Sequence, residues 1–183
     1  KNGSSDFRYL SYTPGKSNND ATDMDVVEKP VFSEKGGFFN NEFQLTLADN
    51  NGNEIYYTTD GSDPRTSETA ELYSESIRIY NNTSEPNVYS AITDISLIGY
   101  NPPKDSVEKG IVIRAASKNA DGKFSEVEHN SYFVGKTASY YKDMKVISMA
   151  TDSDYLFDKD NGAYMIGKEY YEWVRSPEFE KYD

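Results

Sequence analysis

Hydrophobic and polar residues alternate along several short segments of the chain, which is the pattern of a half-buried β-strand. In residues 42–48, Phe43, Leu45 and Leu47 share one face, and polar residues occupy most of the other. The same period of two recurs at residues 77–80 and 111–116, and residues 127–134 are expected to form the return strand. The predicted core therefore comprises Phe43, Leu45, Leu47, Ile77, Ile79, Ile111 and Ile113.

Turn-forming residues separate these segments. Residues 49–53 and 119–122 are rich in Asn, Asp and Gly, which favour tight turns, and residues 55–59 between them favour a strand. Residues 84–109 are long, polar and carry three prolines, so we expect an inserted surface loop there. Many short strands with few helix signals predict an all-β fold, an antiparallel β-sandwich.

The chain after residue 135 follows a different pattern. Residues 146–150 and 163–166 are expected to form two further strands, and residues 155–157 a helical turn, which gives the sandwich a C-terminal α+β extension. The apolar residues of 136–167 are expected to pack against the sandwich, because they otherwise lack a partner. Residues 1–29 are mostly polar and predict a linker or the tail of a preceding module, as part of a longer protein.

Composition narrows the classes of function. The 183 residues include 31 acidic and 19 basic side chains, for a net charge of −12. Such a surface repels phosphate groups, so nucleic acids and anionic membranes are disfavoured as partners. No apolar run approaches the roughly 18 residues of a membrane span. Cysteine is absent and His129 is the one histidine, which leaves thiolate sites, zinc sites and Ser-His-Asp triads little to draw on.

Residues 55–64, with the sequence IYYTTDGSDP, carry a resemblance to a known family. They resemble the signature of the chitobiase/β-hexosaminidase C-terminal type domain, and residues 30–39, 111–115, 121–122 and 132–135 support it. The resemblance implies a small immunoglobulin-like β-sandwich over residues 30–135.

Two further stretches resemble other families. Residues 146–152, 156–158 and 162–167 are similar to the opening of the CotH family, bacterial secreted or spore-coat proteins with an atypical protein-kinase fold. Residues 12–16 are similar to the exit of a lamin-tail domain. The CotH resemblance implies that residues 136–183 open such a domain, outside a bacterial cell or at its surface. It also implies that the phosphate-binding and metal-binding residues of that family lie beyond residue 183.

Three segments invite a chemical interpretation, and each has a simpler one. Gly135-Lys136-Thr137 lacks the earlier glycine of a phosphate loop, because Asn130 stands there, so a strand exit is preferred. Residues 152–162 hold clustered aspartates, but a calcium loop counted from Asp158 has its glycine at position 5 instead of 6. His129 is expected to face solvent on a strand. We predict no catalytic residue, no cofactor and no metal site, and hence no enzyme activity in this chain.

Asp60-Gly61-Ser62-Asp63-Pro64 is predicted to be a structural turn. A glycosidase would place two carboxylates across a sugar, and two carboxylates of one tight turn rarely face each other. In a turn, Asp60 and Ser62 satisfy backbone amides, Gly61 takes a positive φ, and Pro64 stops strand pairing.

Tyrosine is abundant, with 16 residues, and aromatic faces can stack on sugar rings. The weak candidates for ligand contact are Tyr140, Tyr141 and Trp173. The sequence therefore predicts a non-catalytic accessory or spacer module of a cell-surface CotH-type protein, which docks neighbouring domains of the same polypeptide or a cell-surface protein. The alternative is a carbohydrate-binding module of a cellulosome-like system with a polysaccharide partner, which would show a flat, exposed aromatic row on one sheet face.

Overall fold

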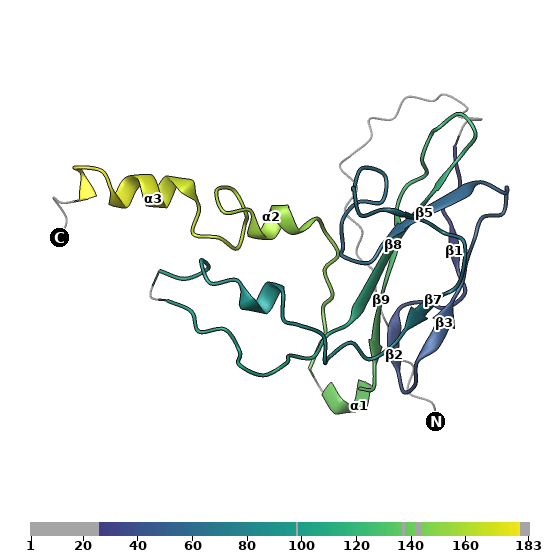
Figure 1. The fold of residues 1–183 in the computed structure, drawn as a ribbon, viewed down its shortest axis with the longest axis horizontal. Helices are drawn as coiled ribbons and strands as arrows, with labels where there is room; N and C mark the ends of the chain where they lie inside the picture. The colour runs from purple at the N-terminus through teal and green to yellow at the C-terminus, as the bar shows by residue number, and fades with distance from the viewer. Residues whose placement is uncertain (1–25, 98, 137, 142–143, 180–183) are drawn as a thin grey trace.

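A computed structural model of the protein describes residues 26–97, 99–136, 138–141 and 144–179. Its body is a β-sandwich of immunoglobulin-like type, as the alternation of residues predicted (Figure 1). One layer is a five-stranded sheet in which β9 and β8 lie at the centre and β2 and β6 at the edges. Its strands, in spatial order, are β2 (Gly37–Phe39), β9 (Glu128–Val134), β8 (Ile111–Lys118), β5 (Glu54–Thr58) and β6 (Glu71–Leu72).

The facing layer consists of two short antiparallel pairs. Strand β1 (Val31–Phe32) pairs with β4 (Leu47–Ala48), and β3 (Phe43–Leu45) pairs with β7 (Ile77–Ile79). Residues 42–48, which we expected to form one strand, are thus divided at Thr46. The division arises because the two halves pair with different partners, and at the break the Thr46 amide donates to the Ser33 hydroxyl instead of continuing the ladder.

The core lies between these layers and is built largely from the predicted residues. Leu45, Leu47, Ile79 and Ile113 are buried, as expected. Phe43, Ile77 and Ile111 are only partly buried, and they pack against the edge of the core. The other buried members of the cluster are Ile55, Ala115, Tyr132 and Val134.

Strands β8 and β9 form the long hairpin at the centre of the sheet. They pair in register from Ile111 opposite Tyr132 to Ala115 opposite Glu128. The predicted turn at residues 119–122 closes this hairpin, where the Gly122 amide donates to the Asn119 carbonyl and Gly122 has a φ of 83°. On the other side of β9, strand β2 runs parallel to it, and every other pairing in the fold is antiparallel among the described residues.

Two segments extend away from the sandwich and lie beside each other (Figure 1). The first is the inserted loop, residues 84–109, which contains a short 3-10 helix, η1 (Tyr89–Ala91), as its regular element. The second is the C-terminal segment, residues 144–179, which contains α2 (Ser153–Phe157) and α3 (Lys168–Val174). The helix α1 (Ala138–Tyr141) comes directly after the sandwich. We call the inserted loop and the C-terminal segment together the arm.

The two strands predicted in the C-terminal segment do not form. Within the described residues, 146–150 have no ladder partner, because the segment meets β9 through the hydroxyls of Ser148 and Ser131 and not through backbone hydrogen bonds. Residues 163–166 fold back locally, since the amides of Ala163 and Tyr164 donate to the carbonyls of Tyr155 and Leu156. The extension is therefore helical instead of α+β, and the helical turn expected at residues 155–157 is present as α2.

The extension also packs differently from our expectation. It contacts the sandwich at its start, where the Ser148 hydroxyl donates to the Ser131 hydroxyl at 2.7 Å. Farther along, Phe157 packs against the inserted loop and not against the core. Residues 1–25, which hold most of the predicted linker and the lamin-tail resemblance, lie outside the described residues. The predicted domain boundaries remain predictions.

We expect Leu45→Ala to lower the free energy of unfolding by about 2–5 kcal/mol, because Leu45 is fully buried and its truncation leaves a cavity. Denaturant titration followed by circular dichroism measures the change. The matched control is Leu72→Ala, since the side chain of Leu72 is 51% exposed. Equal midpoints for the two variants would contradict the assigned core.

Candidate functional site

The turn after β5 is organised around the carboxylate of Asp60. One oxygen accepts from the backbone amide of Ser62 at 2.9 Å and lies 2.6 Å from the Ser62 hydroxyl. The other accepts from the Thr69 hydroxyl at 2.7 Å. Gly61 has a φ of 87°, which L residues with side chains rarely adopt. Asp60 thus accepts a hydrogen bond from a backbone amide and Gly61 has a positive φ, as predicted for a turn. Pro64 follows several residues after the end of β5, and it is fully buried.

Arg114 fastens this turn to the outer face of the five-stranded sheet. It extends from β8, is mostly buried, and donates to the Gly61 carbonyl at 2.7 Å. Asp63 lies 4.0 Å from the Arg114 guanidinium and accepts three side-chain hydrogen bonds and one backbone hydrogen bond from Arg65. The turn therefore covers part of the face of the sheet that points away from the core.

The electrostatics of the turn favour ionised carboxylates. Burial alone would raise the pKa of Asp60, but hydrogen bonds from Ser62 and Thr69 outweigh burial and lower that pKa. Burial also opposes ionisation of Asp63, and the hydrogen bonds and charge of Arg65, with the charge of Arg114, lower its pKa in the same way. Both groups thus serve as hydrogen-bond acceptors and not as proton donors near neutral pH.

A hollow of about 670 Å³ lies where this turn, the inserted loop and the C-terminal segment meet. Its size falls in the range of small-molecule sites, and its lining is mainly apolar. The backbone of Thr151 lies against the turn, since a Cβ atom on Gly61 would be 3.0 Å from the Thr151 carbonyl oxygen. The apolar residues that line the hollow are Pro86, Val88, Tyr89, Val107, Val112, Met149, Leu156 and Phe157.

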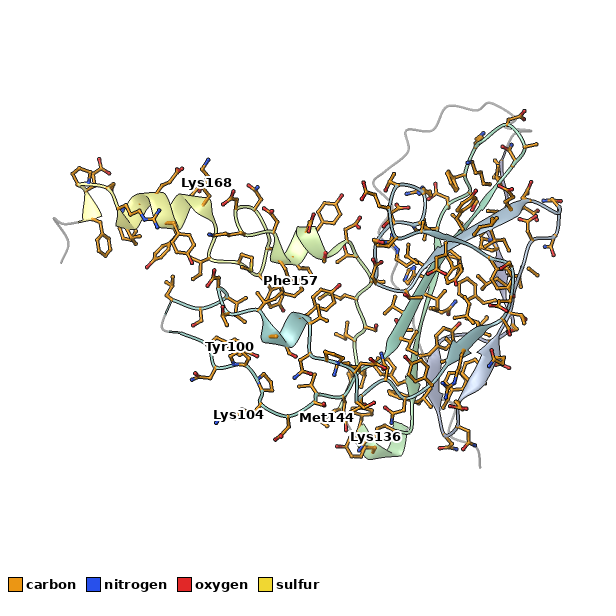
Figure 2. All side chains as sticks on the ribbon, in the orientation of Figure 1. Tyr100, Lys104, Lys136, Met144, Phe157 and Lys168 are labelled. Atoms are coloured by element: carbon orange, nitrogen blue, oxygen red, sulfur yellow. The ribbon has the colours of Figure 1, made fainter. Side chains whose placement is uncertain are left out.

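Tyr89 and Phe157 join the two halves of the arm beside the hollow. Their rings stack with centroids 5.1 Å apart and planes 16° from parallel. The Tyr89 hydroxyl also donates to the Asp60 carbonyl at 3.1 Å, so one side chain links the turn, the inserted loop and α2. Figure 2 shows Phe157 between α2 and the inserted loop. We call this contact the clasp.

A separate contact, built around the Lys136–Glu108 ion pair, holds the base of the inserted loop against the end of β9, and we call it the brace. Lys136 forms an ion pair with Glu108 at 3.1 Å, and its ammonium group lies 3.8 Å from the centroid of the Tyr140 ring. Tyr141 donates to the same Glu108 carboxylate and packs against Phe38. The hydrogen bond to Glu108 and the charge of Glu108 raise the pKa of Lys136.

The predicted ligand candidates do not form a common site. Tyr140 and Tyr141 belong to the brace at α1, whereas Trp173 lies on α3, at the far end of the arm (Figure 1). Trp173 packs edge to face on Phe179. Three residues of this site, Tyr89, Phe157 and Arg114, were not predicted from the sequence as site residues. Neither Tyr89 nor Phe157 belongs to an alternating strand, so no periodic pattern marked them.

The remaining chemical segments are placed as follows. Gly135 and Lys136 follow β9 directly, and Thr137 lies outside the described residues. One Asp158 oxygen accepts from the amides of Asp160 and Asn161, and no group of three or more His, Cys, Asp or Glu able to hold a metal occurs in the described residues. His129 lies opposite Arg114 on β8, on the face of the sheet that points away from the core; it is partly buried there, and burial lowers its pKa.

Aromatic rings near the sheet do not present a flat surface at the positions described here. Tyr56 meets Phe124 at 74° between ring planes, and Tyr57 meets Tyr73 at 78°. Both pairs are edge-to-face contacts, so the two rings of each pair do not lie in one plane. The Tyr57 hydroxyl is in addition engaged with Glu71, and burial together with that contact raises the pKa of Tyr57 to about 12.

The comparisons with known proteins agree with the sandwich. The family model of the chitobiase/beta-hexosaminidase C-terminal domain matches residues 34–93, so this part of the chain is similar to that domain. The match includes β2 to β7 and the turn at residues 60–64, and it ends inside the inserted loop. No curated protein and no solved structure matches the chain. The CotH and lamin-tail resemblances lie outside the matched residues and remain predictions.

We expect Asp60→Asn to lower the free energy of unfolding near neutral pH by about 0.5–1.5 kcal/mol, because the carboxylate accepts hydrogen bonds that an amide accepts less well. The folded-state pKa of Asp60 lies below the unfolded value of about 3.9. The stabilisation that the Asp60 carboxylate provides is therefore fully present above the unfolded-state pKa, and it is lost as the pH falls through the folded-state pKa.

Thermal unfolding of the Asp60→Asn variant and of the parent chain across the acid range tests this expectation. The variant should lose less stability than the parent on acidification. Asp121→Asn, in the exposed hairpin turn, serves as the control and should follow the parent curve. An Asp60→Asn curve that parallels the parent would contradict the assigned role of the carboxylate.

We expect Phe157→Ala to loosen the arm without affecting the sandwich. Aromatic stacking contributes about 0.5–1.5 kcal/mol, so amide exchange in η1 and α2 should accelerate about two- to tenfold. Amides of β8 should exchange at the parent rate. Tyr155→Ala on the same helix is the control, since Tyr155 is 71% exposed. Equal exchange in both variants would show that the clasp does not hold the arm.

Proposed function

We propose that this protein is a non-catalytic accessory module whose sandwich supports the arm as a docking platform. In this proposal the module belongs to a longer bacterial cell-surface protein of CotH type, and the arm contacts a neighbouring domain of the same polypeptide or a second surface protein. The resemblance of residues 146–167 to the CotH opening motivates the choice of partner.

The observation that carries the proposal is the exposure of apolar side chains along the arm. Ile147 is 84% exposed and Met149 63% exposed, although both belong to the most apolar part of the C-terminal segment. Isolated exposed apolar residues are common, but a gathered set marks an interaction surface. The other exposed members are Val88, Leu97, Met144, Tyr155, Tyr164 and Trp173.

The anchoring of the arm supports a platform and not a loose tail. Lys109 donates to the carbonyls of Thr83 and Val107 and to the Asn87 side chain, which ties the two ends of the inserted loop together. The clasp then fixes α2 to that loop. A surface that is already ordered loses less conformational entropy when a partner binds.

Charge and chain composition fit the same role. The net charge of −12 keeps such a module soluble outside a cell and directs it away from phosphate-rich partners. No helix in the described part of the chain is long and apolar enough to cross a membrane. The absence of enzyme activity is part of this proposal and needs its own assay for phosphoryl transfer and glycan hydrolysis.

The docking proposal is tested by hydrogen exchange in two forms of the protein. One is the 183-residue chain, and the other carries its natural flanking sequence. Amides of residues 144–179 should exchange more slowly in the longer form. The double variant Ile147→Asp, Met149→Asp should remove that protection, whereas the matched control Leu72→Asp on β6 should retain it. Equal exchange in the two parent forms would overturn the proposal.

Polysaccharide binding is the second candidate, and the hollow favours it. The hollow is apolar and of suitable size, and Tyr89 at its border is 46% exposed, so part of its ring is open to a ligand. Affinity electrophoresis in gels with soluble polysaccharides tests this function. Retardation that Tyr89→Ala removes and Tyr155→Ala retains would favour a carbohydrate-binding module, and migration independent of polysaccharide would reject it.

A further inference from the structure

The turn between β4 and β5 presents an Asn-Gly pair to solvent. Asn51 and Gly52 are both exposed, and Gly52 has a φ of 74°. A Cβ atom placed on Gly52 would have no heavy atom within 4 Å, so the space around this peptide bond is open. The pair therefore lies where both a reacting side chain and a water molecule have room.

Few contacts restrain the reacting groups of this pair. The Gly52 amide lies 3.5 Å from the Asp49 carbonyl oxygen, at the outer limit of a hydrogen bond. The amides on either side, of Asn51 and Asn53, each donate to one Asp49 carboxylate oxygen at 2.9 Å. Within the described residues, no hydrogen bond holds the Asn51 side-chain amide. The turn is thus fixed around the Gly52 nitrogen while that nitrogen itself is held weakly.

A second Asn-Gly pair, Asn161-Gly162, has the opposite environment. The Gly162 amide donates to the Asp158 carbonyl at 2.8 Å, and the Asn161 side-chain amide donates to the Asp158 carboxylate at 3.2 Å. Gly162 is buried, and a Cβ atom on it would lie 2.6 Å from backbone atoms of Asp158 and Leu156. Both the Gly162 nitrogen and the Asn161 side chain are therefore held by hydrogen bonds.

We propose that Asn51 is a site of spontaneous deamidation in the folded protein and that the fold protects Asn161. The Gly52 nitrogen attacks Cγ of Asn51, the new N–Cγ bond closes a five-membered succinimide, and Nδ2 leaves as ammonia with the Gly52 amide proton. Glycine permits this approach because it has no Cβ atom. Water then adds to either ring carbonyl, which leaves aspartate or isoaspartate at position 51 with no net oxidation or reduction.

The modification changes the turn that leads into β5. The new carboxylate at position 51 lies beside Asp49. Burial would raise the pKa of Asp49, but the hydrogen bonds from the amides of Asn51 and Asn53 lower it. Two adjacent carboxylates repel each other. Isoaspartate additionally inserts a methylene group into the backbone between the amides of residues 51 and 53, which both donate to one Asp49 oxygen. We expect the isoaspartate form to unfold at a lower temperature than the parent chain.

Peptide mapping by mass spectrometry tests the proposal on the whole 183-residue chain. The protein is incubated at neutral pH either folded or in urea, and conversion of each Asn-Gly peptide to its acid form is followed over time. In the folded protein, Asn51 should convert about tenfold faster than Asn161, because protected amides react only after local opening. In urea the two rates should converge.

Two variants complete the design. Asn51→Gln should abolish conversion at position 51, since its longer side chain would have to close a six-membered ring. Asp158→Ala should accelerate conversion at Asn161 in the folded state, with circular dichroism as the check that the sandwich persists. Conversion of Asn161 as fast as Asn51 in the folded parent would overturn the proposal, and so would conversion of Asn51 only in urea.

Discussion

Strand β8 is buried or partly buried along its whole length, and the burial of its two faces organises the rest of the molecule. Ile113 and Ala115 face the core, Ala116 faces the other way, and all three are fully buried. An antiparallel sheet usually leaves one face to solvent. Here the outer face must be covered by something other than a strand layer, and the Asp60 turn and the start of the C-terminal segment provide that cover.

Arg114 shows how the cover is held. Its guanidinium group is mostly buried on the outer face, where a charge without partners would be costly. The Gly61 carbonyl and the Asp63 carboxylate supply those partners, so the turn and the sheet stabilise each other. Tyr89 then hydrogen-bonds the same turn, and through the clasp the turn also positions the arm. The hollow and the position of the arm therefore depend on the contact between Arg114 and the turn.

This dependence separates two levels of stability in the protein. The sandwich is held by a continuous apolar core, whereas the arm is held by single contacts such as the clasp and the Lys136–Glu108 brace. Regions with few buried apolar contacts open at lower free energy than the core. The arm should therefore open at a lower free energy than the sandwich, which keeps its shape.

The sandwich could be predicted from the sequence alone, because the alternation of apolar and polar residues along a strand is a local property. Leu45, Ile79 and Ile113 could be assigned to the core from their neighbours alone, and the Asp60 turn from its residue types. The conformation of the C-terminal segment and the contacts of the arm depend on residues far apart in the sequence, so they could not be predicted in this way. Residues 146–150 have the composition of a strand but contact β9 through the side chains of Ser148 and Ser131 and form no ladder with it. Tyr89 and Phe157 stack although they lie 68 positions apart in sequence, and only the folded chain brings them together.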